Sequence, residues 1–306
     1  MRKTVLITTS SFQVDSNEHL RRLGDAGYDI VLNPLGRRLS EAEVGQLIAD
    51  LEPVGMIAGV EPLTADVIGR ASALRVISRC GVGIDSIDLD AAAANGIEVT
   101  ITPDGPTASV SELTLAMMLA ACRRVVEADR RIRNGEWGGL MGRLLAQQTV
   151  GLIGYGRIGR AVGRLVAAFG ATVVASDPQS GGNHDVPMLS VDELLLRADV
   201  VSLHVPLTDE TRNLMNADRI AGMKPGSILV NASRGGLVDE AALKQSLDDG
   251  HLAAAALDCF ADEPYAGPLC ECPTVVLTAH MGSYAREARA MMELEAAKNL
   301  ASVLLD

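Results

Sequence analysis

The chain has 306 residues, of which 48% are hydrophobic and 3% aromatic, and its formal net charge at pH 7 is −12. This length supports one large or two medium domains with cores of aliphatic side chains, and the negative charge argues against a nucleic-acid partner and against a membrane partner. Five cysteines without disulfide-like spacing, together with no signal-peptide pattern, favour a cytoplasmic location.

The first hundred residues alternate strand-like and helix-like segments. Ser40 followed by Glu43 predicts a capping box at the start of the second helix. This alternation is typical of a small doubly wound α/β domain with a parallel sheet. We expect strands at residues 5–8, 29–32, 55–58, 75–78 and 97–101, and helices at 17–26 and 41–51.

A long helical stretch follows the loop at residues 102–107. Ser109 and Glu112 form a second capping-box pattern, which predicts one continuous helix from residue 109 to about Arg133. Its apolar run is too short to span a bilayer. We interpret this helix as a spine between two domains.

The middle of the chain carries the pattern of a dinucleotide-binding unit. A strand at residues 149–153, a glycine turn, a helix at 160–169 and a strand at 172–176 form one βαβ unit. In such a turn Gly154 permits the tight bend, Gly156 lets a pyrophosphate approach the backbone, and Gly159 lets helix and strand pack closely. The helix N-terminus favours phosphate. Asp177 follows about 20 residues later, where a carboxylate binds the ribose 2′-hydroxyl and repels a 2′-phosphate, so we expect NAD as cofactor.

Polar residues follow the later strands of this half, and ligands of open α/β sheets bind at the carboxyl ends of strands. His280 is a natural general acid or base because imidazole titrates near neutrality. Glu263 would orient its ring, and Arg234 would hold a carboxylate by two parallel hydrogen bonds. Cys270 and Cys272 lack a companion pair, so no metal site is expected. The strands are expected at residues 200–205, 227–232, 254–257 and 275–278, with a helical tail at 283–306 that packs on the first domain.

Six segments in this order resemble the D-isomer-specific 2-hydroxyacid dehydrogenase family, in its D-3-phosphoglycerate dehydrogenase-like branch. The resemblance extends from about Gly55 to the C-terminal helix. The matching segments are residues 79–85, 154–159, 201–206, 223–235, 257–264 and 277–280.

The resemblance implies a role for each matching residue. Arg234, Glu263 and His280 would be the catalytic set, and Asp258 would bind the nicotinamide carboxamide. The substrate-binding residues would be Arg79, Val82, Gly83, Arg234 and His280. The NAD-binding residues would be Gly154, Tyr155, Gly156, Arg157, Ile158, Gly159, Asp177, His204, Val205, Pro206, Ala232, Ser233, Asp258 and His280.

The resemblance also implies an architecture of two doubly wound parallel-sheet α/β domains with an interdomain cleft. Residues 1–101 with 283–306 would form a flavodoxin-like substrate-binding domain, and residues 102–282 a Rossmann NAD-binding domain. Members of the family usually form homodimers through the cofactor domain. The implied reaction is oxidation of a D-2-hydroxy acid to its 2-keto acid, or the reverse.

The leading candidate substrate is 3-phosphoglycerate, and the alternatives are glyoxylate or hydroxypyruvate, or another specialised 2-hydroxy acid. Phosphoglycerate enzymes often carry an arginine where this chain has Ala58, and Glu61 lies nearby. Arg143 or a second subunit could supply the missing positive charge. A different class stays open as well, namely an NAD(H)-sensing protein similar to the transcriptional corepressors that share this fold.

Overall fold

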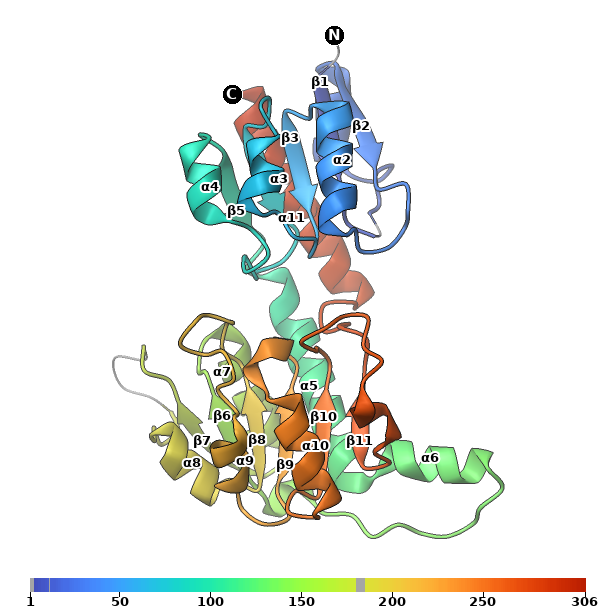
Figure 1. The fold of residues 1–306 in the computed structure, drawn as a ribbon, viewed down its shortest axis with the longest axis vertical. Coiled ribbons are helices and arrows are strands. Elements are labelled where there is room, and N and C mark those ends of the chain that lie inside the picture. Colours follow the sequence, from blue (N-terminus) through green and yellow to red (C-terminus); the bar gives the residue numbers. More distant parts are fainter. Residues whose placement is uncertain (1–2, 11, 180–184) are drawn as a thin grey trace. The chain divides into compact units, whose positions relative to one another are not determined.

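The computed structural model describes residues 3–10, 12–179 and 185–306. The chain divides into two compact units, Met1–Pro106 with Ser283–Asp306 (unit 1) and Thr107–Gly282 (unit 2). Each unit is an α/β domain built on one parallel sheet (Figure 1). Within these residues, every helix is too short or too polar to cross a membrane.

Unit 1 contains a five-stranded parallel sheet in the order β2-β1-β3-β4-β5. This is the flavodoxin-like order, in which the chain changes direction between its first and third strands. All five predicted strands are confirmed, with ends that shift by one or two residues. The strands are β1 (Lys3–Ile7), β2 (Tyr28–Leu32), β3 (Gly55–Ala58), β4 (Val76–Arg79) and β5 (Glu98–Ile101).

Helices cover both faces of this sheet, because successive strand side chains alternate between the two faces. Leu6 points to the face covered by α2, α3 and α4, whereas its neighbours Val5 and Ile7 point to the face covered by α1 and α11. The capping box of Ser40 and Glu43 is confirmed. The helices are α1 (Glu18–Asp25), α2 (Glu41–Leu51), α3 (Ala65–Gly69), α4 (Leu89–Ala94) and α11 (Arg286–Leu305).

The C-terminal helix α11 completes unit 1, as expected. The Tyr28 hydroxyl donates to the Leu304 carbonyl at 2.8 Å, and the Ser78 hydroxyl donates to the Ala296 carbonyl at 2.9 Å. Leu300 is fully buried in the cluster between α11 and the strands. The end of the chain therefore supplies one face of the first sheet's core.

Unit 2 contains a six-stranded parallel sheet in the order β11-β10-β9-β8-β6-β7, so its chain also changes direction between its first and third strands. The predicted βαβ unit is confirmed, although its helix α7 (Arg157–Ala168) begins three residues earlier than expected. The strands are β6 (Thr149–Ile153), β7 (Thr172–Ser176), β8 (Val200–Leu203), β9 (Ile228–Asn231), β10 (Ala254–Leu257) and β11 (Val275–Leu277).

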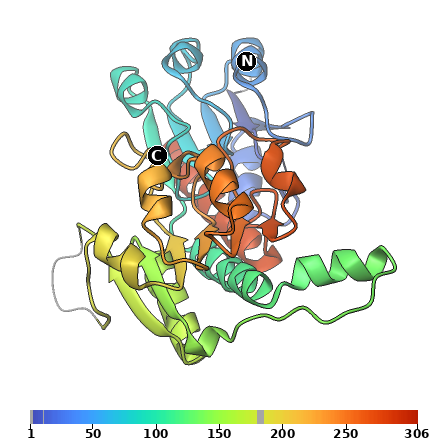
Figure 2. The same cartoon turned by 60° about the horizontal axis from the view of Figure 1, so that its bottom comes forward.

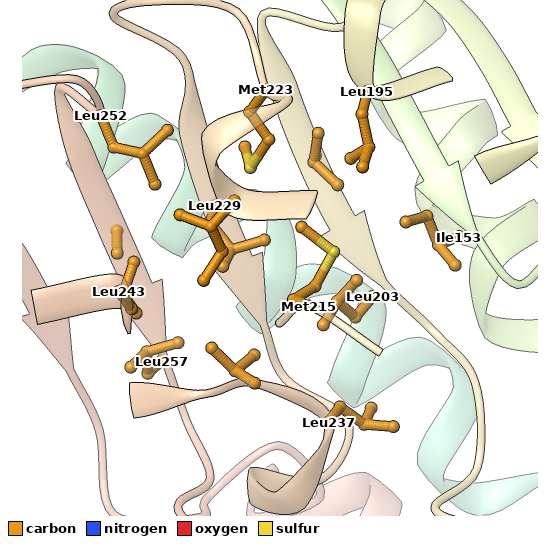
Figure 3. Close-up of a cluster of buried hydrophobic side chains, with 14 of the residues drawn as sticks. Ile153, Leu195, Leu203, Met215, Met223, Leu229, Leu237, Leu243, Leu252 and Leu257 are labelled. Carbon is orange, nitrogen blue, oxygen red and sulfur yellow. The ribbon is translucent and has the colours of Figure 1, made fainter. Parts of the chain in front are cut away.

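Two apolar clusters fill the faces of the second sheet. The cluster shown in Figure 3 joins α8, α9 and α10 to side chains such as Leu203, Leu229 and Leu257. The other cluster joins α5 and α7 to the opposite face. The helices are α5 (Gly105–Arg123), α6 (Val125–Arg133), α7 (Arg157–Ala168), α8 (Val191–Arg197), α9 (Ala217–Ala221) and α10 (Glu240–Asp248), with short 3-10 turns η1 (Leu145–Gln147), η2 (Gly235–Leu237) and η3 (Pro268–Glu271).

The prediction of one continuous helix from residue 109 to Arg133 is wrong. Helix α5 starts at Gly105, so Ser109 lies inside it and does not cap it. The helix stops before Arg124, which adopts φ +54° in the left-handed region. The Cys122 carbonyl accepts a hydrogen bond from the Arg143 N–H at 2.8 Å. Because this contact comes from a distant segment, the local sequence did not reveal the break between α5 and α6.

We expect Leu300→Ala to destabilise unit 1 by about 2–5 kcal/mol, because the truncation leaves a cavity in a fully packed site. Hydrogen exchange should accelerate at the amides of β1 and β3. Leu294→Ala is the control, since Leu294 lies on the same helix and is 44% exposed. Unchanged exchange in β1 and β3 of the Leu300 variant would show that α11 does not support this sheet.

Candidate active site

Five predicted site residues of unit 2 come directly after a single line of paired residues across the sheet. The pairing registers join Ser176, Ile153, Leu203, Asn231, Leu257 and Leu277 from strand to strand. Neighbouring strands lie about 4.8 Å apart, so the six strand ends span roughly 24 Å. Figure 1 shows the strands side by side. The residues that come directly after this line are Asp177, Gly154, His204, Ala232, Asp258 and Thr278.

The glycine turn after β6 is shaped by close backbone approach. Gly154 adopts φ +93°, and a Cβ there would overlap the His204 carbonyl. A Cβ on Gly159 would overlap the Gly154 carbonyl oxygen. Both positions therefore require glycine for the packing of the protein itself.

Gly156 differs from these two glycines, because a Cβ at this position would meet no protein atom within 4 Å. It is the N-cap residue of α7 and provides no side-chain cap for that helix. No side chain at Gly156 therefore covers the start of α7, where the positive end of the helix dipole favours an anion. This open cradle fits the pyrophosphate of a dinucleotide.

Asp177 lies beside this turn and is partly buried. Its carboxylate accepts hydrogen bonds from the backbone N–H groups of Tyr155 and Gln179, at 2.8 and 2.9 Å. The Tyr155 side chain is buried under the turn and donates to Asp185 at 2.9 Å; burial and this bond raise the pKa of Tyr155 to about 12. Arg157 and Ile158 begin α7.

The loops after β8 and β9 are joined by a hydrogen bond. The Ser233 hydroxyl donates to the Val205 carbonyl at 2.6 Å. His204 shares a 2.9 Å hydrogen bond with the Ser202 hydroxyl, and burial lowers the pKa of His204 to about 4. His204 is therefore neutral near pH 7. Pro206 follows on the exposed side of this loop, and Ala232 is partly buried.

Arg234 is positioned by a turn that the sequence reasoning missed. The buried Asn231 side chain accepts from the Ser233 N–H at 3.0 Å and donates to the Arg234 carbonyl at 2.7 Å. The Arg234 guanidinium donates to the Ser233 carbonyl at 2.8 Å. A Cβ on Gly235 would overlap the Phe260 backbone, so this turn lies directly against the segment that leads to Glu263. An asparagine at a strand end, in Asn-Ala-Ser-Arg-Gly, is the signal that could have predicted the turn.

The structure brings His280 and Glu263 together. The His280 Nδ1 atom lies 3.0 Å from both Glu263 carboxylate oxygens. The two side chains are 31% and 18% exposed, so the pair is partly shielded from water. When Nδ1–H donates to the carboxylate, Nε2 is left to accept or donate a proton. The Phe260 N–H also donates to Glu263, at 3.1 Å, and fixes its carboxylate.

Asp258 is 1% exposed, and its carboxylate accepts three hydrogen bonds from the segment around His280. The donors are the Thr278 hydroxyl at 2.6 Å, the Met281 N–H at 2.8 Å and the Gly282 N–H at 2.8 Å. A buried carboxylate is stable only with such partners. The contacts with Thr278 and Gly282 were not anticipated from the sequence.

In unit 1, the Arg79 guanidinium bonds within its own loop. It donates to the Gly83 carbonyl at 2.9 Å and to the Cys80 carbonyl. Val82 is 38% exposed at the tip of this loop. Ala58 is buried in β3, and the buried Glu61 carboxylate accepts from the Thr8 hydroxyl and the Gly59 N–H. The structure thus uses Glu61 to hold a loop.

Arg143 lies away from these strand ends. Its Nη2 atom lies close to Gly226, which precedes β9, and its backbone bonds to the end of α5. It lines a cavity of about 300 Å³ together with Ile228 and Ala254, the first residues of β9 and β10. This is the amino edge of the sheet, opposite the edge that carries the glycine turn and Asp258. In residues 3–10, 12–179 and 185–306, we find no cluster of three or more His, Cys, Asp or Glu side chains suited to a metal ion.

A known protein family matches more than half of the chain. Residues 115–282 match the family described as D-isomer specific 2-hydroxyacid dehydrogenase, NAD binding domain. The matched range includes the glycine turn and the residues after β8, β9, β10 and β11.

Three similar proteins illustrate the relationship. A D-3-phosphoglycerate dehydrogenase from Mycobacterium tuberculosis (strain ATCC 25618 / H37Rv) is 42% identical over 241 residues, which is 76% of this chain and 46% of that protein. A hydroxypyruvate reductase from Thermotoga maritima is 36% identical over 272 residues, covering 86% and 88%. The crystal structure of the TT0316 protein from Thermus thermophilus has a TM-score of 0.90 and 41% identity, covering 99% and 97% of the two chains. The chain spans about half the length of the phosphoglycerate dehydrogenase that it matches.

The two glycines of the turn give a sharp test of dinucleotide binding. We expect Gly156→Ala to leave the melting temperature nearly unchanged and to weaken NADH binding about 10-fold, because the methyl group enters the open cradle. Gly159→Ala should instead destabilise unit 2, because its methyl group overlaps protein backbone. Fluorescence titration with NADH and thermal denaturation measure the two effects. Unimpaired NADH binding by a folded Gly156→Ala variant would contradict the assignment of this turn.

Proposed function

Because the chain belongs to the D-isomer specific 2-hydroxyacid dehydrogenase family, we propose that it interconverts a D-2-hydroxy acid and its 2-keto acid. The observation that carries this proposal is the His280–Glu263 pair, at 3.0 Å, on the edge of the sheet that also carries the glycine turn. Proton transfer and dinucleotide binding are the two requirements of such a reaction, and one sheet edge supplies residues for both.

His280, Glu263 and Arg234 have different roles in the proposed reaction. When bound, a reduced nicotinamide would supply the hydride for the carbonyl carbon of the keto acid. His280 then donates a proton from Nε2 to the carbonyl oxygen, and in oxidation it accepts the hydroxyl proton. Glu263 stabilises the charged imidazolium and holds the ring orientation. Arg234 binds the substrate carboxylate and polarises the carbonyl.

We assign dinucleotide binding to residues 102–282 and substrate binding to residues 1–101 with 283–306. Backbone groups of Val82 and Gly83 bind the carboxylate in this proposal, and Arg79 adds positive charge. The hydrogen bond from Arg79 to the Gly83 carbonyl supports a fixed loop conformation. In this proposal Asp258 would hold the nicotinamide carboxamide, because a carboxylate offers about four acceptor positions and three donors of the protein bond to it.

The preferred cofactor in this proposal is NAD. Asp177 places a carboxylate beside the glycine turn, where it accepts from the Tyr155 N–H at 2.8 Å. A carboxylate at this place suits a ribose 2′-hydroxyl, and its charge disfavours a 2′-phosphate.

The leading substrate candidate is 3-phosphoglycerate, because relatives with that activity in their names are 35–42% identical. A specific observation favours a second candidate, an unphosphorylated acid such as hydroxypyruvate or glyoxylate. Ala58 is buried at the position where phosphoglycerate enzymes often carry an arginine. Arg143 lies at the amino edge of the unit 2 sheet, opposite the edge that carries the glycine turn. A sensor that binds NADH without turnover is the alternative from another class.

His280→Ala should lower kcat for reduction of the best keto acid by about 10²–10⁴-fold, the usual contribution of a general acid. NADH should still bind, because the variant leaves the glycine turn intact. Stopped-flow absorbance at the nicotinamide band and NADH titration give the two values. Near-normal turnover in this variant would contradict the proposed role of His280.

The substrate and cofactor are tested by one panel of kcat/KM values. Pyruvate, glyoxylate, hydroxypyruvate and 3-phosphohydroxypyruvate are each compared with NADH and NADPH. We expect NADH to be preferred, and Asp177→Ala should reduce that preference. Tight NADH binding without turnover of any keto acid would favour the sensor.

We also propose that the protein forms a homodimer through unit 2. Helix α6 and the loop that follows it project from the rest of this unit (Figures 1 and 2). Apolar residues on such a projection indicate a surface that another protein chain covers. A second copy is the simplest occupant. The exposed apolar residues of this projection are Val125, Ile132, Trp137, Met141 and Leu144.

Trp137 is 93% exposed, and Trp137→Ser should weaken the dimer by at least about 10-fold, because buried tryptophans are common interface anchors. Analytical ultracentrifugation over a concentration series measures the dissociation constant. Leu196→Ser is the control, since Leu196 lies on α8 and is 68% exposed. A wild-type protein that remains monomeric at high concentration would overturn the proposal.

A further inference from the structure

The segment His280–Gly282 is held from both sides. On one side, the His280 N–H donates to the Asp258 backbone carbonyl at 2.6 Å, and the next two N–H groups donate to the Asp258 carboxylate. On the other side, the Ser109 hydroxyl donates to the Gly282 carbonyl at 2.6 Å. The three N–H groups of this segment and the Gly282 carbonyl thus each have a hydrogen-bond partner.

Ser109 connects this segment to the core of unit 2. It lies in helix α5, is 8% exposed, and its bond spans 173 residues of sequence. Space is also limited there, because a Cβ on Gly282 would lie 3.2 Å from both Asp258 and Val110. The segment is therefore clamped between the end of β10 and helix α5.

The conformation of His280 shows why such a clamp is needed. Its backbone has φ +49°, in the left-handed region that residues with a Cβ rarely adopt. Such a conformation persists only where the surrounding structure determines it. The hydrogen bonds of the clamp hold this backbone conformation. In it, the His280 Nδ1 atom lies 3.0 Å from the Glu263 carboxylate.

We propose that Ser109 and Asp258 are positioning residues that hold the His280 imidazole against Glu263. The expected effect on kcat rests on the proposed dehydrogenase function. The expected effect on the position of the His280 ring rests on the geometry alone. Neither residue transfers a proton itself. Small displacements of a reacting group reduce rates strongly, by about 10²-fold for 1 Å.

Ser109→Ala should lower kcat about 10-fold while KM for the keto acid and the Kd of NADH change less than about 2-fold. Ser111→Ala is the matched control, because Ser111 is buried in the same helix but bonds only to Ala108 of that helix. Ser109→Thr keeps a hydroxyl and should restore most of the rate. Thr278→Val removes a donor to Asp258 and tests the other side of the clamp if Ser109→Ala does not fold.

A spectroscopic readout separates this inference from the proposed function. In the cofactor-free protein labelled with ¹⁵N, the ring-nitrogen signals of His280 should shift in Ser109→Ala and in Asp258→Asn, and should stay unchanged in Ser111→Ala. If Asp258 acted only on the cofactor, the ring-nitrogen signals of His280 would not change in Asp258→Asn.

The outcomes are distinguishable. If the wild-type protein turns over no keto acid but the His280 signals shift in Ser109→Ala and Asp258→Asn, the clamp is supported and the dehydrogenase function is rejected. An active wild type, together with a Ser109→Ala variant that has normal kcat and unshifted signals, would overturn the clamp.

Discussion

At the end of β10, the buried Asp258 carboxylate accepts hydrogen bonds from three groups of the segment 278–282. Removing a carboxylate from water is costly, and the cost is offset only while those donors remain in place. The position of His280 is thereby tied to the core of the second sheet. The proposed proton transfer depends on this constraint more directly than on any single contact of the histidine ring.

The parallel sheet extends the same constraint to the dinucleotide turn. Gly154 and Asp258 belong to segments about 100 residues apart, yet both follow the register line that joins Ile153, Leu203, Asn231 and Leu257. Backbone hydrogen bonds continue beyond the line, from His204 to Ile153 and from Asp258 to Asn231. The distance between the turn and Asp258 is therefore fixed by strand spacing, and hydrogen bonds to Asp258 tie the segment 278–282 to the same sheet edge.

Much of this arrangement was predictable from the sequence, because buried parallel strands are short apolar runs and their polar successors meet at one edge. The glycine turn was expected for these reasons. Glu263 was expected beside His280 because a carboxylate there orients the imidazole ring. What the sequence could not reveal depends on distant contacts. Ser109 matches a local capping pattern, but its hydroxyl bonds to Gly282, and the break before Arg124 accompanies a backbone bond from Arg143 to Cys122.

The surroundings of Ala58 are a second example of contacts that the sequence did not reveal. The sequence indicated an acid near the substrate, whereas the structure binds the Glu61 carboxylate to Thr8 and Gly59 within unit 1. An acidic residue in the sequence is therefore not by itself evidence of repulsion toward an anionic substrate.

The central claim is that the sheet edge of unit 2 combines a dinucleotide turn with a proton-transfer pair for D-2-hydroxy acids. Its most direct test is the reduction of a 2-keto acid with NADH that carries deuterium at the transferable C4 position. The account predicts a product of D configuration with one deuterium at C2. A product of L configuration, or one without deuterium at C2, would contradict it.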